Sequence, residues 1–373
     1  MLPPMNQAAR LPRLRDALSR SAHQDPAAPR PVDALLITSL TNIRYLTGFT
    51  GSAGMLFVLP EQTRLLTDGR YRTQAQEQLE AAGVKADVVI APAASQQEEG
   101  TRIAGGLSAL GLEAAHVSWA RQRVFAETWF PGTELIPTTG LVENLRRVKD
   151  AGEIARIEDA CRIADDALHN LRDRLAKLPP EAEFGRELDF EMRRLGASGP
   201  SFETIVAAGE NAAKPHHRPG SKSIAPNAPI VIDFGALVDG YCSDMTRTVW
   251  TGRLEDPTLR RAVEVVLASQ AAGVAAVRPG IAASEVDRAC REVITEAGWA
   301  EAFVHGTGHG VGLDIHEAPS VAATSTDTLE PGHVVTVEPG VYLPGLGGVR
   351  IEDTVVVTED GCRPLTHTPK DTP

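Results

Sequence analysis

The chain has 373 residues, more than the roughly 250–300 at which a single hydrophobic core stops growing, so two domains are expected. Hydrophobic residues make up 42% and charged residues 23%, as in ordinary soluble globular proteins. The net charge of −12 argues against nucleic acid as a partner, because phosphate binding requires a basic surface. No apolar run is long enough to span a membrane, and no secretory signal is recognisable. Four dispersed cysteines suit a reducing compartment, which predicts a cytoplasmic location.

The first third of the sequence alternates between strand-like and helix-like segments. Leu11, Leu14 and Leu18 recur at helical spacing and predict an amphipathic first helix, and the Pro- and Ala-rich stretch 24–31 predicts a linker. Short apolar runs then predict strands, and the stretches between them predict helices: strands at 34–38, 55–59, 64–67 and 87–91, helices at 70–82 and 96–110. This alternation is typical of an α/β domain.

The middle of the sequence changes character. Residues 141–178 carry an apolar stripe at helical spacing that stops before Pro179-Pro180, which predicts a long helix. We therefore expect two domains, residues 1–143 and residues 144–373. The second is predicted to contain hairpin-like strands and helices: strands at 229–236, 241–250, 334–338 and 349–358, helices at 258–277 and 283–297. This pattern predicts that the second domain is an α+β domain with a largely antiparallel sheet.

Two carboxylates lie close together in the first of these hairpins. Asp239-Gly240 is a two-residue hairpin signal. That turn sets Asp233 opposite Thr246 and brings Asp244 to the same side of the sheet. Like charges that lose hydration together on an apolar sheet destabilise the fold by several kcal/mol unless a cation compensates them.

A second pair of carboxylates repeats the pattern. Glu338 and Glu352 are symmetric about Gly345 in a Gly/Pro-rich connection, so they are expected to face each other on a second hairpin. Any one acid taken alone is better explained as a surface residue or half of an ion pair. Two pairs of acids, each within apolar strands, are better explained as ligands of divalent metal ions, which bind carboxylate oxygens.

Histidines accompany these acids. His305, His309 and His316 lie in a glycine-dense segment, where a zinc-binding helix is improbable and the nucleotide-loop pattern G-x-G-x-x-G is not matched in register. His216 and His217 lie in a predicted loop before the first acidic strand. Beside four converging carboxylates, such histidines are better explained as ligands or proton carriers than as structural residues.

Other hydrolase chemistries fit less well. Ser52 does not lie in a G-x-S-x-G motif. Cys242 has no recognisable base to activate it as a nucleophile, and cysteine is commonly buried as a small hydrophobe.

Four stretches, VIDFGALVDGYCSDMTRT, GTGHGVGLDIHEAP, TVEPGVY and GVRIEDTVVVT, follow one another within residues 147–360. Here the sequence resembles the pita-bread metallopeptidases, which include prolidase (Xaa-Pro dipeptidase), aminopeptidase P and methionine aminopeptidase. The resemblance implies two divalent metal ions, Mn²⁺ first and Co²⁺ or Zn²⁺ as alternatives. The implied metal ligands are Asp233, Asp244, His309, Glu338 and Glu352.

The resemblance also implies roles around the metals. Glu338 would act in catalysis as the proton acceptor, and His216 and His316 would contact the scissile carbonyl and the leaving side of the substrate. Arg350 would steady the carboxylates, and Tyr342 matches a substrate-contacting tyrosine after the E-P-G motif. The substrate would be a peptide with proline at its second position.

The N-terminal domain narrows the resemblance. Methionine aminopeptidases lack it, whereas 42–54 and 67–71 look like aminopeptidase P and related bacterial prolidases. The family commonly dimerises through this domain, so a homodimer is expected. Arg44 and Arg70 are interpreted as structural surface residues, with binding of a peptide carboxylate across a subunit boundary as the alternative.

The resemblance leaves several functions open. The leading hypothesis is an aminopeptidase P-like Xaa-Pro exopeptidase, with an Xaa-Pro dipeptidase as the alternative. A non-catalytic pita-bread binding protein and a creatinase-like amidinohydrolase are less favoured, because relatives of those kinds lose the metal ligands and all five are present here.

Overall fold

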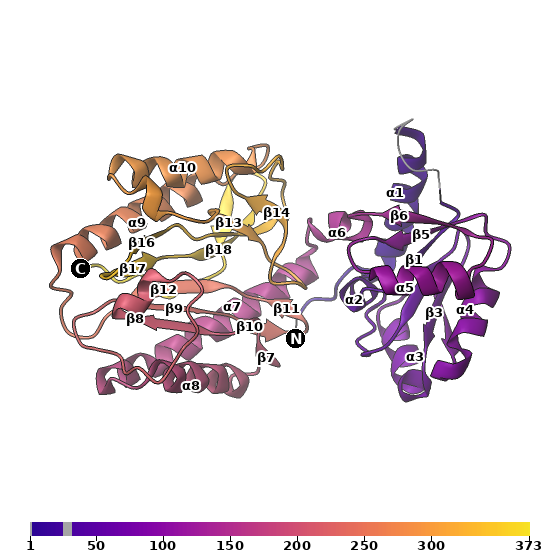
Figure 1. The fold of residues 1–373 in the computed structure, drawn as a ribbon, viewed down its shortest axis with the longest axis horizontal. Helices are drawn as coiled ribbons and strands as arrows, with labels where there is room; N and C mark the ends of the chain where they lie inside the picture. Colours follow the sequence, from indigo (N-terminus) through magenta and orange to yellow (C-terminus); the bar gives the residue numbers. More distant parts are fainter. Residues whose placement is uncertain (1, 25–31) are drawn as a thin grey trace. The chain divides into compact units, whose positions relative to one another are not determined.

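The computed structural model describes residues 2–24 and 32–373, so the linker predicted at 24–31 lies, apart from Gln24, outside the described residues. The chain divides into two compact units (Figure 1). One unit spans Pro4–Arg146, and the other contains Arg147–Pro373 together with Leu2 and Pro3.

The N-terminal unit is built on a mixed sheet with the strand order β4-β3-β2-β1-β5-β6. Strand β1 pairs antiparallel with β2 and parallel with β5, and its residues are fully buried. This is the predicted α/β arrangement. The strands are β1 (Ala34–Ile37), β2 (Met55–Val58), β3 (Thr63–Thr67), β4 (Asp87–Ile90), β5 (Ala109–Glu113) and β6 (Glu134–Thr138).

Local signals delimit the helices of this unit. Ser39 accepts a hydrogen bond from the Asn42 N–H at the start of one helix, and Gly48 ends it in the left-handed conformation. The helix predicted at 96–110 is too long, because the chain turns at Gly105 and enters β5 at Ala109. The helices are α1 (Arg10–Gln24), α2 (Leu40–Thr47), α3 (Arg72–Ala81), α4 (Gln96–Ala104), α5 (Trp119–Val124) and α6 (Leu141–Arg146).

The first half of the C-terminal unit packs two helices against antiparallel strands. Helices α7 (Ala151–Leu171) and α8 (Glu181–Arg194) share a hydrophobic core with β8 (Ile205–Ala208), β9 (Ile230–Phe234) and β12 (Met245–Val249) (Figure 1). The helix predicted at 141–178 is wrong in its extent. Asp150 starts α7 with a capping box to Glu153, which separates it from α6.

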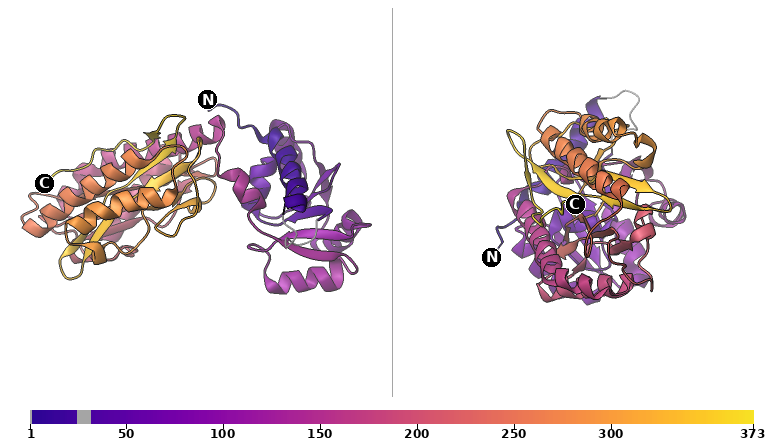
Figure 2. Two further views of the ribbon diagram at one scale, coloured as in Figure 1. Left: turned by 90° about the horizontal axis from the view of Figure 1, so that it is seen from above. Right: turned by 90° about the vertical axis from the view of Figure 1, so that its left-hand side faces the viewer.

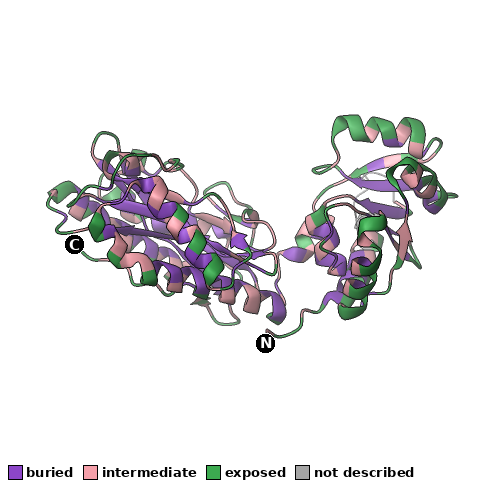
Figure 3. Cartoon of the chain, turned by 90° about the horizontal axis from the view of Figure 1, so that it is seen from below, coloured by how far each residue is buried: buried purple, intermediate pink, exposed green. Residues whose placement is uncertain are grey.

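The second half repeats this arrangement with other elements. Helices α9 (Pro257–Ala276) and α10 (Ala283–Glu296) lie side by side and form a second core with β15 (Val334–Val337) and β18 (Asp353–Val357) (Figures 1 and 2). The strands between the helices are buried, whereas the outer helix faces are exposed (Figure 3). The remaining strands are β7 (Gly199–Pro200), β10 (Ala236–Val238), β11 (Tyr241–Cys242), β13 (Gly308–Gly310), β14 (Glu317–Val321), β16 (Gly340–Leu343), β17 (Gly347–Arg350) and β19 (Cys362–Pro364).

The predicted strands 229–236, 241–250 and 349–358 are each broken in two. Pairing in this unit is antiparallel, as predicted. The interruptions fall at Gly235, at Ser243-Asp244 and at Ile351-Glu352. A Cβ on Gly235 would lie 1.9 Å from the Ser243 carbonyl oxygen, so the strands approach too closely there for a side chain. Two of the acids therefore lie at breaks in the ladders rather than within continuous strands.

No helix in the described part of the chain is both long and apolar enough to cross a bilayer. The four cysteines carry free thiols, and Cys161, Cys242 and Cys290 are buried.

Candidate metal centre

The first acidic pair is positioned by the predicted hairpin. Asp239 and Gly240 both have positive φ, 45° and 77°, and join β10 to β11 in a two-residue turn. The same register continues into β9 and β12, where Asp233 pairs with Thr246. Because side chains alternate between faces, Asp244 lies on the same side as Thr246.

The second pair faces each other across another break. Strands β16 and β17 pair Gly340 with Arg350, and β15 and β18 pair Val337 with Asp353. Glu338 and Glu352 occupy the opposed positions between these two ladders, symmetric about Gly345 as the sequence indicates. Oxygens of Asp233, Asp244 and Glu352 all lie within 4.8 Å of one another.

His309 completes the cluster from a strand that glycine makes possible. A Cβ on Gly308 would lie 2.0 Å from the Thr336 carbonyl oxygen, so a larger residue would force β13 away from β15. His309 Nδ1 lies 3.1 Å from the Gly310 carbonyl oxygen. That contact turns Nε2 toward the acids, 3.5 Å from Asp244 Oδ2 and 3.4 Å from Glu338 Oε1.

The electrostatics of the cluster call for a cation. Burial raises the pKa of Asp244 well above its ordinary range, and the charges of Glu352, Asp233 and Glu338 raise it further. The pKa of Glu352 is raised in the same way, and burial raises the pKa of Glu338 to about 7. Glu352 Oε1 is buried and has no hydrogen-bond partner among the described residues. Burial also lowers the pKa of His309. Clustered carboxylate oxygens, one of them without a hydrogen-bond partner in the described residues, together with this imidazole fit divalent metal ions.

Threonines and one arginine fix the carboxylates. Thr246 donates to Glu352 Oε2 at 2.7 Å, and Thr336 donates to Glu338 Oε1 at 3.1 Å. Arg350 donates from Nη2 to Asp233 Oδ2 at 2.5 Å and from Nε to Thr246 Oγ1 at 3.1 Å. The threonines were not singled out from sequence. The sequence did contain a signal for them, because Thr246 lies two residues after Asp244 and Thr336 two residues before Glu338, a spacing that puts each threonine on the same sheet face as its acid.

A cavity of about 530 Å³ opens onto the cluster. His216 and His316 line it and are exposed, and the His316 ring stacks edge-on against His309 with centroids 4.3 Å apart. The neighbouring His217 differs, because its Nε2 contacts the fully buried Glu181 at 2.8 Å. Glu181 also accepts from the backbone N–H groups of Ala208 and Gly220, so it anchors the loop that carries His216.

The remaining predicted residues lie in different surroundings. Tyr342 is buried, and its hydroxyl contacts Arg350 Nη1 at 2.8 Å and His305 Nε2 at 2.7 Å. Arg44 lies on α2 of the N-terminal unit and is half-buried. Arg70 is exposed and pairs with Asp68 at 2.8 Å. The substrate-binding roles predicted for Tyr342 and Arg44 stay predictions.

Comparison with known proteins identifies the family. The model of metallopeptidase family M24 matches residues 155–359, and that of the creatinase/prolidase N-terminal domain matches residues 10–148. The chain belongs to metallopeptidase family M24. Its two-part architecture is accordingly a creatinase/prolidase-like domain followed by a pita-bread catalytic domain, and the enzyme is a metal-dependent peptidase, a hydrolase.

Relatives of this M24 metallopeptidase extend over nearly the whole chain. An uncharacterised peptidase of Bacillus subtilis, YqhT, is 41% identical over 342 residues, which are 91% of this chain and 95% of that protein. An Xaa-Pro dipeptidase from Bacillus anthracis has a solved structure with 37% identity and a TM-score of 0.90, covering 98% of this chain and 99% of its own. An X-Pro aminopeptidase from Thermotoga maritima has 32% identity and a TM-score of 0.85, covering 91% and 97%.

Proposed function

We propose that this metallopeptidase removes the N-terminal residue from peptides that carry proline at the second position, in the manner of aminopeptidase P. The main support is that four acids and one histidine converge beside a cavity that exposed histidines line. These five residues are Asp233, Asp244, His309, Glu338 and Glu352. Relatives named as Xaa-Pro peptidases support the proline preference. An Xaa-Pro dipeptidase is the alternative, since relatives of both names match this chain to a similar extent.

The five residues would hold two divalent cations, Mn²⁺ in the first place and Co²⁺ or Zn²⁺ as alternatives. Asp244 and Glu352 would be among the ligands of these ions and are the most deeply buried acids of the cluster. When bound, such ions polarise a substrate carbonyl and lower the pKa of water.

The protein's own groups supply the proton transfers. Glu338 would take a proton from the attacking water at a carboxylate oxygen and deliver it to the departing proline nitrogen. His316 and His216 would stabilise the negative charge on the scissile carbonyl oxygen and orient the leaving side. Arg350 would hold Asp233 in place through its 2.5 Å hydrogen bond. Tyr342 would act through Arg350 and His305, because its buried hydroxyl contacts both.

The decisive experiment strips the protein with a chelator, adds Mn²⁺, and detects free alanine from Ala-Pro-Ala and from Ala-Pro. Cleavage of the tripeptide that depends on manganese is the expected result. Cleavage of the dipeptide alone would instead establish the dipeptidase. If neither is cut with Mn²⁺, Co²⁺ or Zn²⁺, the proposed specificity for peptides with proline at the second position is wrong.

A matched pair of variants tests the site itself. Asp244→Asn removes a central ligand with little change in shape, so turnover is expected to vanish while circular dichroism stays that of the native fold. Asp256→Asn is the control and is expected to keep full turnover, because Asp256 is half-buried at the start of α9 and asparagine can still cap that helix. Near-normal activity in Asp244→Asn would contradict the assignment of Asp244 as a metal ligand.

Two further expectations complete the proposal. We expect a homodimer that forms through the N-terminal unit. Binding of a peptide carboxylate by Arg44 or Arg70 across the subunit boundary is the alternative to a structural role for these arginines. We also expect a cytoplasmic location, in agreement with the free thiols. Sedimentation of the native protein would test the first, and cell fractionation the second.

A further inference from the structure

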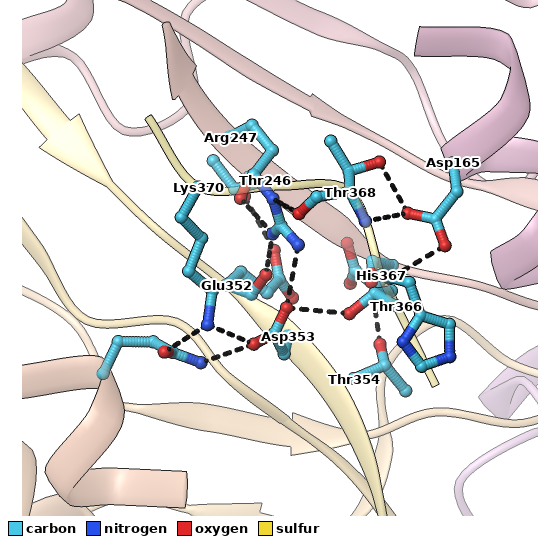
Figure 4. Close-up of polar contacts among 12 residues, drawn as sticks. Asp165, Thr246, Arg247, Glu352, Asp353, Thr354, Thr366, His367, Thr368 and Lys370 are labelled. Carbon is cyan, nitrogen blue, oxygen red and sulfur yellow. Dashed lines mark hydrogen bonds and ion pairs between the residues drawn. The ribbon is translucent and has the colours of Figure 1, made fainter. Parts of the chain in front are cut away.

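Behind the metal cluster lies a second buried network that the proposed reaction does not use (Figure 4). Thr246 and Glu352 turn their side chains toward the cluster, and the residues that follow them, Arg247 and Asp353, turn to the opposite face. Arg247 and Asp353 form an ion pair at 2.9 Å, and their side chains are only 2% and 6% exposed. The two faces of the same strands therefore carry the two networks.

The back network grips the backbone of Glu352. Arg247 Nη1 donates to the Glu352 carbonyl oxygen and, at 3.0 Å, to the Thr246 carbonyl oxygen. The Glu352 N–H donates to the Thr246 carbonyl oxygen at 3.1 Å. On the same segment, Thr354 donates to the Asp244 carbonyl oxygen at 2.7 Å. Arg247 thus holds the backbone of Glu352, and Thr354, the residue after Asp353, holds the backbone of Asp244.

The C-terminal tail, defined here as residues 366–371, completes this network (Figure 4). Lys370 Nζ donates to Asp353 Oδ2 at 2.6 Å and to Gln270 Oε1 at 2.7 Å. Thr366 donates to Asp353 Oδ1 at 2.9 Å, and the Thr368 carbonyl oxygen accepts from Arg247 Nε at 2.9 Å. The tail therefore supplies partners for both members of the buried ion pair.

Asp165 on α7 holds the tail at His367 and Thr368, and Arg172 forms an ion pair with Asp371 at its end. Asp165 accepts from the His367 N–H at 2.8 Å, the Thr368 N–H at 2.7 Å and the Thr368 hydroxyl at 2.6 Å (Figure 4). Its neighbour Asp166 makes a surface ion pair with Arg162 at 2.8 Å. Within the part of the chain that the structure describes, Asp166 makes no hydrogen bond or ion pair with the tail.

We propose that the C-terminal tail is a positioning strap that sets the affinity of the metal centre through Arg247 and Asp353. This inference rests on the proposed metal-dependent function. Groups that orient metal ligands from outside the coordination sphere typically change metal affinity or activity by roughly 10- to 100-fold when removed. Detaching the strap is therefore expected to weaken Mn²⁺ binding without abolishing the reaction.

The test uses the full chain with three variants. Asp165→Asn presents an amide donor to the tail N–H groups and releases the strap at a distance from the cluster. Lys370→Met removes the tail ammonium group from Asp353. Asp166→Asn is the matched control, since it neutralises an adjacent acid on the same helix. Each chelator-stripped protein is titrated with Mn²⁺ by calorimetry, its metal-free thermal unfolding is recorded, and its turnover is measured at low and saturating Mn²⁺.

We expect Asp165→Asn and Lys370→Met to bind Mn²⁺ roughly 10-fold more weakly or worse. Saturating Mn²⁺ is expected to restore kcat, and Asp166→Asn to behave as the unsubstituted protein. Unchanged affinity in Asp165→Asn, or lost turnover that saturating Mn²⁺ does not restore, would overturn the strap while the proposed function stands. Absence of Mn²⁺, Co²⁺ and Zn²⁺ binding by the unsubstituted protein would refute the proposed metal-dependent function and the strap together.

Discussion

A buried ion pair beside the glycine-rich segment that carries His309 and His316 allows a test of what an uncompensated buried charge does to stability. Lys149 Nζ lies 2.7 Å from Glu317 Oε1, and the two side chains are 1% and 9% exposed. Glu317 follows His316 directly and packs against Gly312, where an added Cβ would lie 2.3 Å from Glu317 Oε1. The pair therefore fixes the segment that presents His316 to the cavity.

Removing one member of this pair leaves the other charge buried without its compensating partner. Lys149→Met is expected to cost about 3–5 kcal/mol, whereas Lys149→Met combined with Glu317→Leu should recover most of that loss. Arg147→Met is the control, because Arg147 pairs with Asp327 at 2.8 Å but both side chains are partly exposed, 22% and 26%. For such a pair a loss of about 1 kcal/mol or less is expected.

Hydrogen–deuterium exchange is the assay, because a chain with two units need not unfold in one step. Peptides covering 311–321 are expected to exchange roughly 10²- to 10³-fold faster in Lys149→Met, since about 1.4 kcal/mol corresponds to a factor of ten. Turnover should fall as well, because His316 loses its fixed position. If Lys149→Met combined with Glu317→Leu is as unstable as Lys149→Met alone, the loss of stability does not come from a buried charge left without compensation.

Three further outcomes are expected at the metal centre. Gly308→Ala places a Cβ against the Thr336 carbonyl oxygen and should destabilise the protein by about 1–3 kcal/mol or more in denaturant unfolding, whereas Gly361→Ala, with nothing within 4 Å, should be silent. Thr336→Val removes the hydroxyl that donates to Glu338 and accepts from the His309 N–H, so kcat/KM should fall roughly 10- to 100-fold, and unchanged kinetics would contradict its positioning role. In the chelated protein the raised pKa of Glu338 means that the folded state holds more protons than the unfolded state, so thermal stability should be lost as the pH rises from about 4.5 to about 7. Excess Mn²⁺ should reverse that trend, and a chelated protein that gains stability with rising pH would contradict it.

Local signals in the sequence determined the pairing of the acids. Asp239-Gly240 selects a two-residue turn, and that turn alone sets Asp233 opposite Thr246. Symmetry about Gly345 likewise set Glu338 opposite Glu352. Both inferences hold because a hairpin register depends on the turn and on a side-chain period of two, which are properties of adjacent residues.

Other features depended on contacts between distant segments, which no local pattern encodes. The backbone at Gly235 approaches Ser243 closely where the strands break beside Asp244, and the backbone at Gly308 approaches Thr336 closely beside His309. His217 and His216 both line the cavity, but His217 Nε2 contacts Glu181, 36 residues earlier in the chain, whereas the His216 residue is exposed.

The same holds for the charges behind the site. Lys149 meets Glu317, and Lys370 meets Asp353, only after the helices and strands have packed. Sequence alone thus determined that Asp233 and Asp244 lie on one side of their hairpin and that Glu338 and Glu352 face each other. The tertiary structure decided how the two pairs meet His309 and which buried charges hold them, because burial and long-range pairing exist only in the folded chain.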